Sequence, residues 1–257
     1  MRPYAAVRLG VFEPSVRDGD RRRKPLPGTV ANREEMQPSI DAVCFDLDGT
    51  LLEYNQDGDV ILEKSFDRAD VAAFCDIGEL WNCADDVPDA EDDHHFLTQT
   101  FEIAAGRHGG PSAAAERLAR AYEATIDHTA VSFREGAERA LEYARAHGPV
   151  GLVTNGERAT QSVKLEALGI HGCFETHVYA GEMTPPKPAP EPFDRAVAEL
   201  GTDPGRTLYV GNSFEADIVG AREAGLRAAW FPEDGARDGR DAPEYVFESL
   251  DELEAVL

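Results

Sequence analysis

Two carboxylates follow a short apolar stretch near the start of the chain. Residues 43–50 read VCFDLDGT, so Asp46 and Asp48 are separated by a single residue and are followed at once by Gly49. In an extended chain, residues two apart start on the same side, and a glycine permits the sharp turn that must follow. Oxygen ligands of this kind suit a hard cation such as Mg²⁺. The alternative interpretation is a solvated acidic turn in an acid-rich protein.

Polar groups also follow a second apolar run. Thr154, Asn155 and Gly156 come directly after residues 150–153 and supply a hydroxyl, an amide and a flexible backbone position. Side-chain donors and exposed backbone N–H groups of this kind can hold the oxygens of a phosphate. An ordinary Asn-Gly turn would have the same sequence, so this segment indicates a phosphate site only in combination with others.

Two further segments supply a cation and more oxygen ligands. Lys187 lies within the sequence PPKP and is one of only four lysines in the chain. The proline frame would fix its ammonium as a point charge suited to phosphate. Asn212 and Asp217 follow the apolar run 207–210 and provide oxygen ligands. Taken singly, these segments also fit a proline-rich loop and a helix N-cap.

The elements that must position these residues are short apolar runs separated by helical patterns. Strands separated by helices favour parallel pairing with helices on both faces of the sheet, so we expect an α/β, doubly wound, Rossmann-like fold. The predicted strands are residues 40–45, 150–154, 177–179, 207–210, 227–231 and 245–247.

One connection, from about residue 55 to residue 130, is too long for a loop in a compact domain. It carries three apolar stripes at helical spacing, in residues 62–73, 97–104 and 115–126. We therefore expect an inserted all-α domain at residues 57–129, and a core formed by residues 39–56 and 130–257.

Composition excludes several classes of partner. The chain of 257 residues has a formal net charge of -24, which repels nucleic acids and anionic membranes. No apolar stretch is long enough to cross a bilayer, there is no signal-peptide pattern, and the four cysteines form no CxxC pair. A cytoplasmic protein with reduced thiols is expected. The acidic, lysine-poor composition further indicates a salt-adapted, halophilic source, in which salt screens the repulsion between carboxylates.

The first 38 residues differ from the rest and are predicted to form a disordered basic leader. Residues 1–35 contain eight Lys or Arg and five Asp or Glu, including the run RRRK at 21–24. Met36 precedes the first predicted strand. Translation starting at Met36 is one interpretation, and a basic arm that binds nucleic acid is the alternative.

In this order, the four segments resemble the four motifs of the haloacid dehalogenase (HAD) superfamily, in its phosphatase type with a helical cap after the first motif, similar to phosphoglycolate phosphatases. The resemblance covers about residues 39–235 and includes QSVKLEALGI at 161–170 and GEMTPPKPAPEPF at 181–193. It implies a Rossmann-like core with the helical insertion as a mobile cap. It also implies a Mg²⁺-dependent hydrolase of small phosphorylated metabolites.

The resemblance assigns a role to each motif residue. Asp46 would be the nucleophile that forms an aspartyl-phosphate, and Asp48 would be the general acid and then the general base. Lys187 would neutralise the phosphoryl oxygens. Thr154, Asn155 and Gly156 would bind the phosphate, and Mg²⁺ would be held by Asp46, Asp48, Asn212 and Asp217.

One departure from the family pattern leaves other functions open. Most family phosphatases begin the fourth motif with Gly-Asp, whereas this chain has Gly211 and Asn212. An amide oxygen can bind Mg²⁺ but brings no charge, so metal affinity would fall unless Asp217 compensates. The alternatives are a sugar phosphomutase of the β-phosphoglucomutase type and a non-catalytic protein that binds a phosphometabolite. The physiological substrate and the oligomeric state cannot be read from the sequence.

Overall fold

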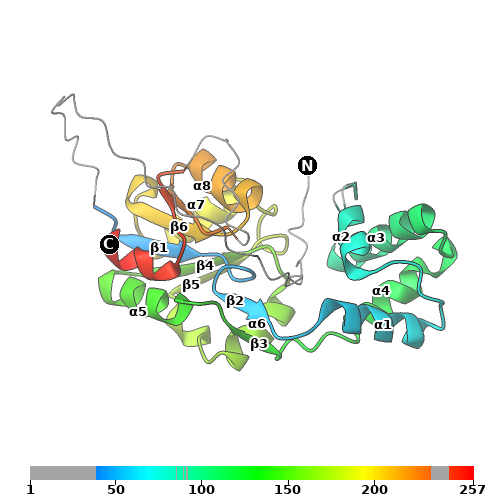
Figure 1. The fold of residues 1–257 in the computed structure, drawn as a ribbon. Helices are drawn as coiled ribbons and strands as arrows, with labels where there is room; N and C mark the ends of the chain where they lie inside the picture. Colours follow the sequence, from blue (N-terminus) through cyan, green and yellow to red (C-terminus); the bar gives the residue numbers. More distant parts are fainter. Residues whose placement is uncertain (1–38, 85, 89, 91, 233–242) are drawn as a thin grey trace, which may run out of the picture.

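Six parallel strands form the centre of the molecule. The computed structural model describes residues 39–257 apart from 85, 89, 91 and 233–242, so the predicted leader at 1–38 lies outside the described residues. The sheet has the order β5-β4-β1-β6-β7-β8 (Figure 1). Its strands are β1 (Ala42–Phe45), β4 (Val150–Thr154), β5 (Thr176–Tyr179), β6 (Thr207–Gly211), β7 (Arg227–Trp230) and β8 (Tyr245–Val246). The predicted α/β, Rossmann-like fold is confirmed.

The central strands are apolar throughout because helices cover both faces of the sheet. Every residue of β1, β4 and β6 is buried, as expected for parallel strands between two helical layers. In register, Phe45 of β1 lies between Leu152 of β4 and Val210 of β6. The three strands therefore end together at one edge of the sheet.

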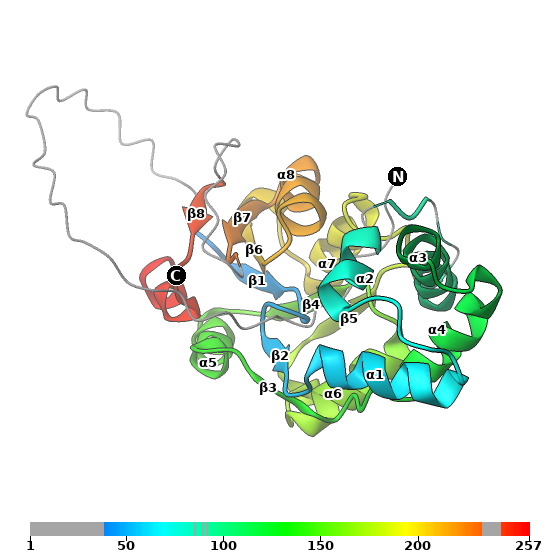
Figure 2. The same cartoon turned by 45° about the vertical axis from the view of Figure 1, so that its right-hand side comes forward.

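Each face of the sheet has its own helices. One face packs against α5 (Ala137–His147), α6 (Arg158–Ala167) and the terminal helical segment η5 (Leu250–Ala255). The other packs against α7 (Glu191–Leu200), the segment η4 (Phe214–Val219) and α8 (Gly220–Glu223), which continues η4. Figure 2 shows α5 and α7 on opposite sides of the strands. Short helical turns η2 (His171–Cys173) and η3 (Pro204–Arg206) precede β5 and β6.

The long connection is helical, as predicted, and has a hydrophobic core of its own. Its helices are α1 (Gly58–Ala69), α2 (Ile77–Ala84), α3 (Asp93–His108) and α4 (Ala115–Glu123), with a turn η1 (Ser112–Ala114) before α4. In Figure 1 the four helices gather beside the sheet layer. Ala73 was expected to extend the first helix, but α1 ends at Ala69 because Asp70 adopts a left-handed conformation at φ 51°.

Two short strands join this helical insertion to the core, and the sequence did not predict them. β2 (Leu52–Tyr54) pairs antiparallel with β3 (Val131–Phe133), so the chain leaves and re-enters the core side by side. Three residues are too few to show a periodic pattern.

None of the helices in the described part of the chain is long and apolar enough to cross a membrane.

Candidate active site

The carboxyl edge of the sheet brings three charged side chains together. The chain passes from β1 to β4 and β5 on one side and then to β6 on the other, so the ends of β1 and β6 form the switch point where α/β folds bind ligands. The Lys187 Nζ atom, from the loop after β5, lies 2.8 Å from Asp46 Oδ1 and 2.6 Å from Asp217 Oδ1. All three residues are buried.

Burial and charge shift the protonation of this triad. Burial, assisted by the charges of Asp217 and Asp48 and opposed by Lys187, raises the pKa of Asp46 to about 7. Burial alone would lower the pKa of the Lys187 ammonium, but the carboxylates of Asp217 and Asp46 raise it above its ordinary value. Lys187 is therefore a fixed positive charge, and Asp46 is mostly ionised only near or above neutral pH.

The loop after β1 turns sharply and brings Asp46 near Asn212. The carbonyl of Leu47 accepts the N–H groups of the three residues at 50–52, and Gly49 has the positive φ of 75° that the predicted turn required. The Thr50 Oγ1 atom then lies 3.2 Å from Asp46 Oδ2 and 3.3 Å from Asn212 Oδ1. Oxygen atoms of the first and fourth motifs thus converge on one hydroxyl.

Asp48 lies on the other side of the loop in a cage of donors. Its Oδ1 accepts hydrogen bonds from Lys164 Nζ at 2.7 Å and from the Tyr54 hydroxyl at 2.9 Å, and its Oδ2 accepts one from Gln161 Nε2 at 2.6 Å. Burial alone would raise the pKa of Asp48, but the Lys164 ammonium and these hydrogen bonds hold it below its ordinary value. Asp48 is therefore ionised.

The residues at the end of β4 form hydrogen bonds with α6 and with the loop that carries Lys187. Thr154 Oγ1 accepts a hydrogen bond from Gln161 Nε2 at 2.7 Å and another from the Gly156 N–H at 3.2 Å. The Asn155 amide bonds the backbone of Lys187 twice, by accepting from its N–H at 2.8 Å and donating to its carbonyl at 3.1 Å. Asn155 therefore fixes the loop that carries the lysine.

Comparison with protein-family models shows which family this chain belongs to. Residues 40–225 match the model of the haloacid dehalogenase-like hydrolases. The chain belongs to this family. The match includes the ends of β1, β4, β5 and β6, and therefore all of the residues described above. The family predicted from the sequence is confirmed.

Individual relatives within the family cover the chain to different extents. Over 124 residues it is 36% identical to pyrimidine 5'-nucleotidase YjjG of Escherichia coli, a match that covers 48% of this chain and 55% of YjjG. Over 109 residues it is 38% identical to the N-acylneuraminate-9-phosphatase of Rattus norvegicus, covering 41% and 44%. The matched region thus spans about half the length of these two relatives. Pyrophosphatase PpaX of Bacillus velezensis matches over 226 residues at 26% identity, covering 83% and 94%.

Solved structures share the fold. The HAD-hydrolase YfnB from Bacillus subtilis, solved bound to magnesium, superposes with a TM-score of 0.70 at 22% identity and covers 86% of this chain and 99% of YfnB. A predicted phosphoglycolate phosphatase from Haemophilus somnus superposes with a TM-score of 0.68 at 18% identity, covering 84% and 97%. At these identities the likeness shows the fold alone.

Four residues at the HAD site were not predicted as site residues from the sequence. Lys164 and Gln161 lie on α6 and contact Asp48, Tyr54 lies on β2, and Tyr209 lies on β6 beside Lys187. The rarity of lysine was the available signal, because Lys164 is another of the four lysines and is only 2% exposed. No local pattern distinguishes the two tyrosines or the glutamine from core residues.

Arg134 connects the returning chain to the motif loop. Its guanidinium donates to the Gly49 carbonyl and lies over the Phe231 ring, 4.1 Å from the centroid. Its backbone N–H donates to the carbonyl of Leu51 at 3.0 Å. The end of the helical insertion is therefore attached directly to the loop that carries both aspartates.

The donor set at Asp46 suits a hard cation. Among the described residues, no cluster of three or more His, Cys, Asp or Glu side chains is arranged to hold a metal ion. The Thr50 hydroxyl lies within hydrogen-bond distance of both Asp46 Oδ2 and the Asn212 amide oxygen, so these oxygens form a small group. Asp217 is engaged elsewhere: its Oδ1 accepts from Lys187, and its Oδ2 accepts from the Ser213 N–H at 2.9 Å. The ligand roles of Asp46, Asp48, Asn212 and Asp217 stay predictions.

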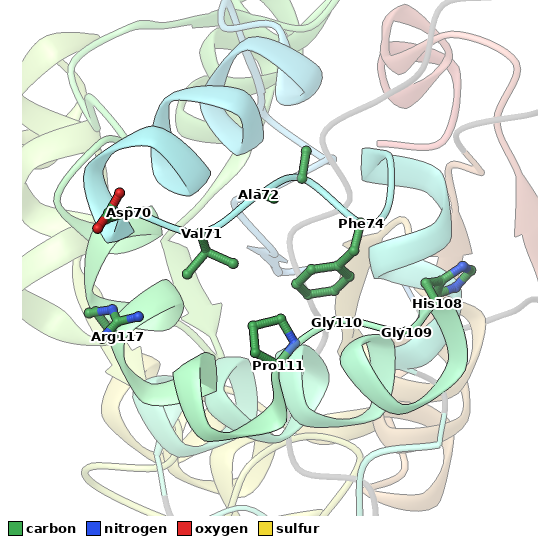
Figure 3. Close-up of a pocket in the computed structure, with 10 residues that line it drawn as sticks. Asp70, Val71, Ala72, Phe74, His108, Gly109, Gly110, Pro111 and Arg117 are labelled. Atoms are coloured by element: carbon green, nitrogen blue, oxygen red, sulfur yellow. The ribbon is translucent and has the colours of Figure 1, made fainter.

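A separate hollow lies in the helical insertion, with a volume of about 490 Å³. Figure 3 shows it between the α1–α2 connection and the α3–α4 connection, with Val71, Phe74 and Pro111 pointing into it and Asp70 and Arg117 at one side. The motif residues all belong to the described part of the chain, and none of them lines this hollow. This hollow is therefore separate from the candidate site at the sheet edge.

Proposed function

We propose that this HAD-like protein is a Mg²⁺-dependent phosphohydrolase of small organic phosphate monoesters that works through an aspartyl-phosphate on Asp46. The observation that carries the proposal is the buried contact of Asp46 with Lys187 at the switch point of the sheet. An ammonium held beside a carboxylate nucleophile can neutralise the phosphoryl group that the carboxylate attacks. Two of the relatives are named as a nucleotidase and an N-acylneuraminate-9-phosphatase, which supports the same substrate class. The pyrophosphatase name supports hydrolysis at phosphorus more generally.

In the first step a carboxylate oxygen of Asp46 attacks phosphorus as the bond from phosphorus to the ester oxygen breaks. Asp48, which is ionised in the free protein, takes up a proton from water as the ester binds and gives this proton to the departing alkoxide. Lys164 opposes protonation of Asp48, but the negative charge of a bound phosphate ester favours it. The products of this step are the free alcohol, the aspartyl-phosphate and an ionised Asp48.

In the second step Asp48 acts as the base. Its ionised carboxylate, held in a fixed orientation, can take a proton from the water that attacks the aspartyl-phosphate. The bond between Asp46 and phosphorus breaks, inorganic phosphate leaves and Asp46 returns as a carboxylate. Lys187, held by Asn155 at its backbone, stays positively charged throughout.

Mg²⁺ would be held by the Asp46 carboxylate, the Asp48 backbone carbonyl and the Asn212 amide, with Asp217 as a further candidate. When bound, it draws negative charge from the phosphoryl group and orients that group for attack. The amide of Asn212 carries no charge, so we expect weaker Mg²⁺ binding than a carboxylate at this position would give.

The helical insertion would act as the cap that closes over the substrate, with residues 57–129 as the cap and 39–56 and 130–257 as the core. Such closure excludes water and bulky substrates. The attachment of both connecting strands near the motif loop supports this role, because Tyr54 of β2 bonds Asp48. We therefore infer a small phosphorylated metabolite as substrate.

The test is hydrolysis of p-nitrophenyl phosphate and a panel of metabolite phosphates by the full chain, with MgCl₂ or EDTA, in dilute and in concentrated KCl. We expect Mg²⁺-dependent release of inorganic phosphate and a loss of about 10³-fold or more in Asp46→Asn. Formation of an isomerised sugar phosphate without free phosphate would support the phosphomutase instead. Equal inertness of the wild type and the variant, with phosphate still bound, would indicate a binding protein.

A further inference from the structure

Lys187 has more acceptors around it than protons to donate. Its Nζ atom lies 2.8 Å from Asp46 Oδ1, 2.6 Å from Asp217 Oδ1, 2.8 Å from the Tyr209 hydroxyl oxygen and 3.0 Å from the Val153 carbonyl. An ammonium carries three N–H donors. The lysine is 2% exposed, so water does not relieve this competition. Every N–H of Lys187 is therefore already engaged by the protein.

The Tyr209 hydroxyl reaches two of the same acceptors. It lies 3.0 Å from the Val153 carbonyl and 3.1 Å from Asp217 Oδ1. Its ring is fully buried and packs edge-on against Phe193, with the centroids 4.9 Å apart. The oxygen is therefore fixed in place, while its O–H can rotate toward either acceptor.

A phosphoryl group bound at Asp46 would need a hydrogen bond from Lys187, and the Tyr209 hydroxyl can make an N–H of Lys187 available for it. To bond a phosphoryl oxygen, Lys187 must withdraw an N–H from one of its present acceptors. A buried acceptor left without a donor costs more than an ordinary hydrogen bond contributes. Two side-chain donors of the described residues, Lys187 and the Tyr209 hydroxyl, lie within hydrogen-bond distance of both the Val153 carbonyl and Asp217 Oδ1. When Lys187 turns an N–H away, the Tyr209 O–H is therefore the donor that can replace it.

We propose that Tyr209 is a positioning residue that takes over an acceptor of Lys187, the Val153 carbonyl or Asp217, and so releases one N–H for the phosphoryl group. The inference rests on the proposed function, since it assumes that the phosphoryl group binds between Asp46 and Lys187. It assigns to Tyr209 an effect on phosphate binding that is separate from its packing in the core.

The test uses Tyr209→Phe, which keeps the ring and removes the hydroxyl. Without phosphate, Lys187 in this variant has three acceptors for three N–H groups, so we expect an unfolding temperature within about 3 °C of the wild type. Titration calorimetry with inorganic phosphate in MgCl₂ should show binding weakened by about 10-fold. The KM for p-nitrophenyl phosphate should rise in parallel.

Tyr122→Phe is the matched control. Tyr122 is 2% exposed and lies in the helical insertion, and its hydroxyl has no hydrogen-bond partner in the described part of the chain. Removing that hydroxyl should leave phosphate affinity unchanged. If the Tyr209 hydroxyl had only a structural role, Tyr209→Phe would lower the unfolding temperature and would leave phosphate binding unchanged.

Three results would overturn the inference. Unchanged phosphate affinity in an active Tyr209→Phe variant would refute the exchange of donors and leave the proposed function intact. A large loss of stability without phosphate would show that the hydroxyl is needed in the resting state. A wild type that neither binds phosphate nor hydrolyses esters would refute the inference together with the proposed function.

Discussion

Replacing Lys164 with methionine should destabilise the protein through Asp48. The Lys164 Nζ atom lies 2.7 Å from Asp48 Oδ1, and the lysine is only 2% exposed. Removing one partner of a buried ion pair costs about 3–5 kcal/mol, because the other charge is left uncompensated. Asp48 keeps its hydrogen bonds from Gln161 and Tyr54, and its side chain is 18% exposed. We therefore expect a smaller loss, about 2–3 kcal/mol, in the free energy of unfolding at pH 7.

The assay is a double-mutant cycle followed by urea unfolding. Lys164→Met, Asp48→Asn and the double variant are compared with the wild type. Each single variant leaves one buried charge without its partner, whereas the double variant leaves neither. The two single losses should therefore exceed the loss in the double variant by about 2 kcal/mol. Lys64→Met is the control, because Lys64 is exposed on α1, and it should change stability by less than about 0.5 kcal/mol.

A coupling energy below about 0.5 kcal/mol would refute this reasoning. The ion pair would then contribute no more than a surface pair, and water rather than Lys164 would compensate Asp48. The same result would remove the physical basis for the low pKa of Asp48. A coupling near 2 kcal/mol with unchanged stability in Lys64→Met would support a buried ion pair that stabilises Asp48.

Three further substitutions test other parts of the molecule. Asn212→Asp should tighten Mg²⁺ binding by about 10-fold, measured from the Mg²⁺ dependence of hydrolysis, because a carboxylate adds negative charge to the donor set. Gly211→Ala should abolish activity and destabilise the fold, measured by hydrolysis and thermal unfolding, because an added Cβ would lie 2.5 Å from the Cβ atom of Asp217. The hydrogen bond and charge of Glu123 raise the pKa of His94, so this pair stabilises the fold below the ordinary histidine pKa, and the stabilisation is lost as the pH rises through the raised value. His94→Gln should therefore reduce the fall in unfolding free energy as the pH rises above the ordinary histidine pKa, by roughly 0.5 kcal/mol at this site, where the His94 side chain is 33% exposed.

The location of the candidate site could be predicted because it depends on strand ends. Parallel strands of one sheet end at the same edge, so polar residues directly after β1 and β6 must come close whatever their side-chain conformations. The resemblance to the HAD motifs then gave the family. Neither step required knowledge of a side-chain torsion angle, and both were confirmed at the level of the fold and the family.

The partners of each site residue could not be predicted, since they depend on side-chain orientation and on distant segments. Asp48 and Lys164 are 116 residues apart in the chain, and no local pattern links them. Asn155 has the right chemistry for phosphate, but its amide groups bond the backbone of Lys187. The β2–β3 pair depends on the contact of Leu52 with Phe133 and on strands of only three residues.

The charge of the site accounts for the use of lysine in a chain that has so little of it. Two of the four lysines are buried here, and they face three carboxylates: Lys187 pairs with Asp46 and Asp217, and Lys164 pairs with Asp48. Fully ionised, this set has a net charge of -1, and a divalent cation would make it +1. A compact ammonium with three donors can contact two carboxylates at once, which a planar guanidinium does less readily in a buried space. A protein of net charge -24 repels anions in general. Under the proposed function, these two lysines and a bound cation would therefore attract the phosphate dianion, and the attraction should survive high salt because buried charges are screened little.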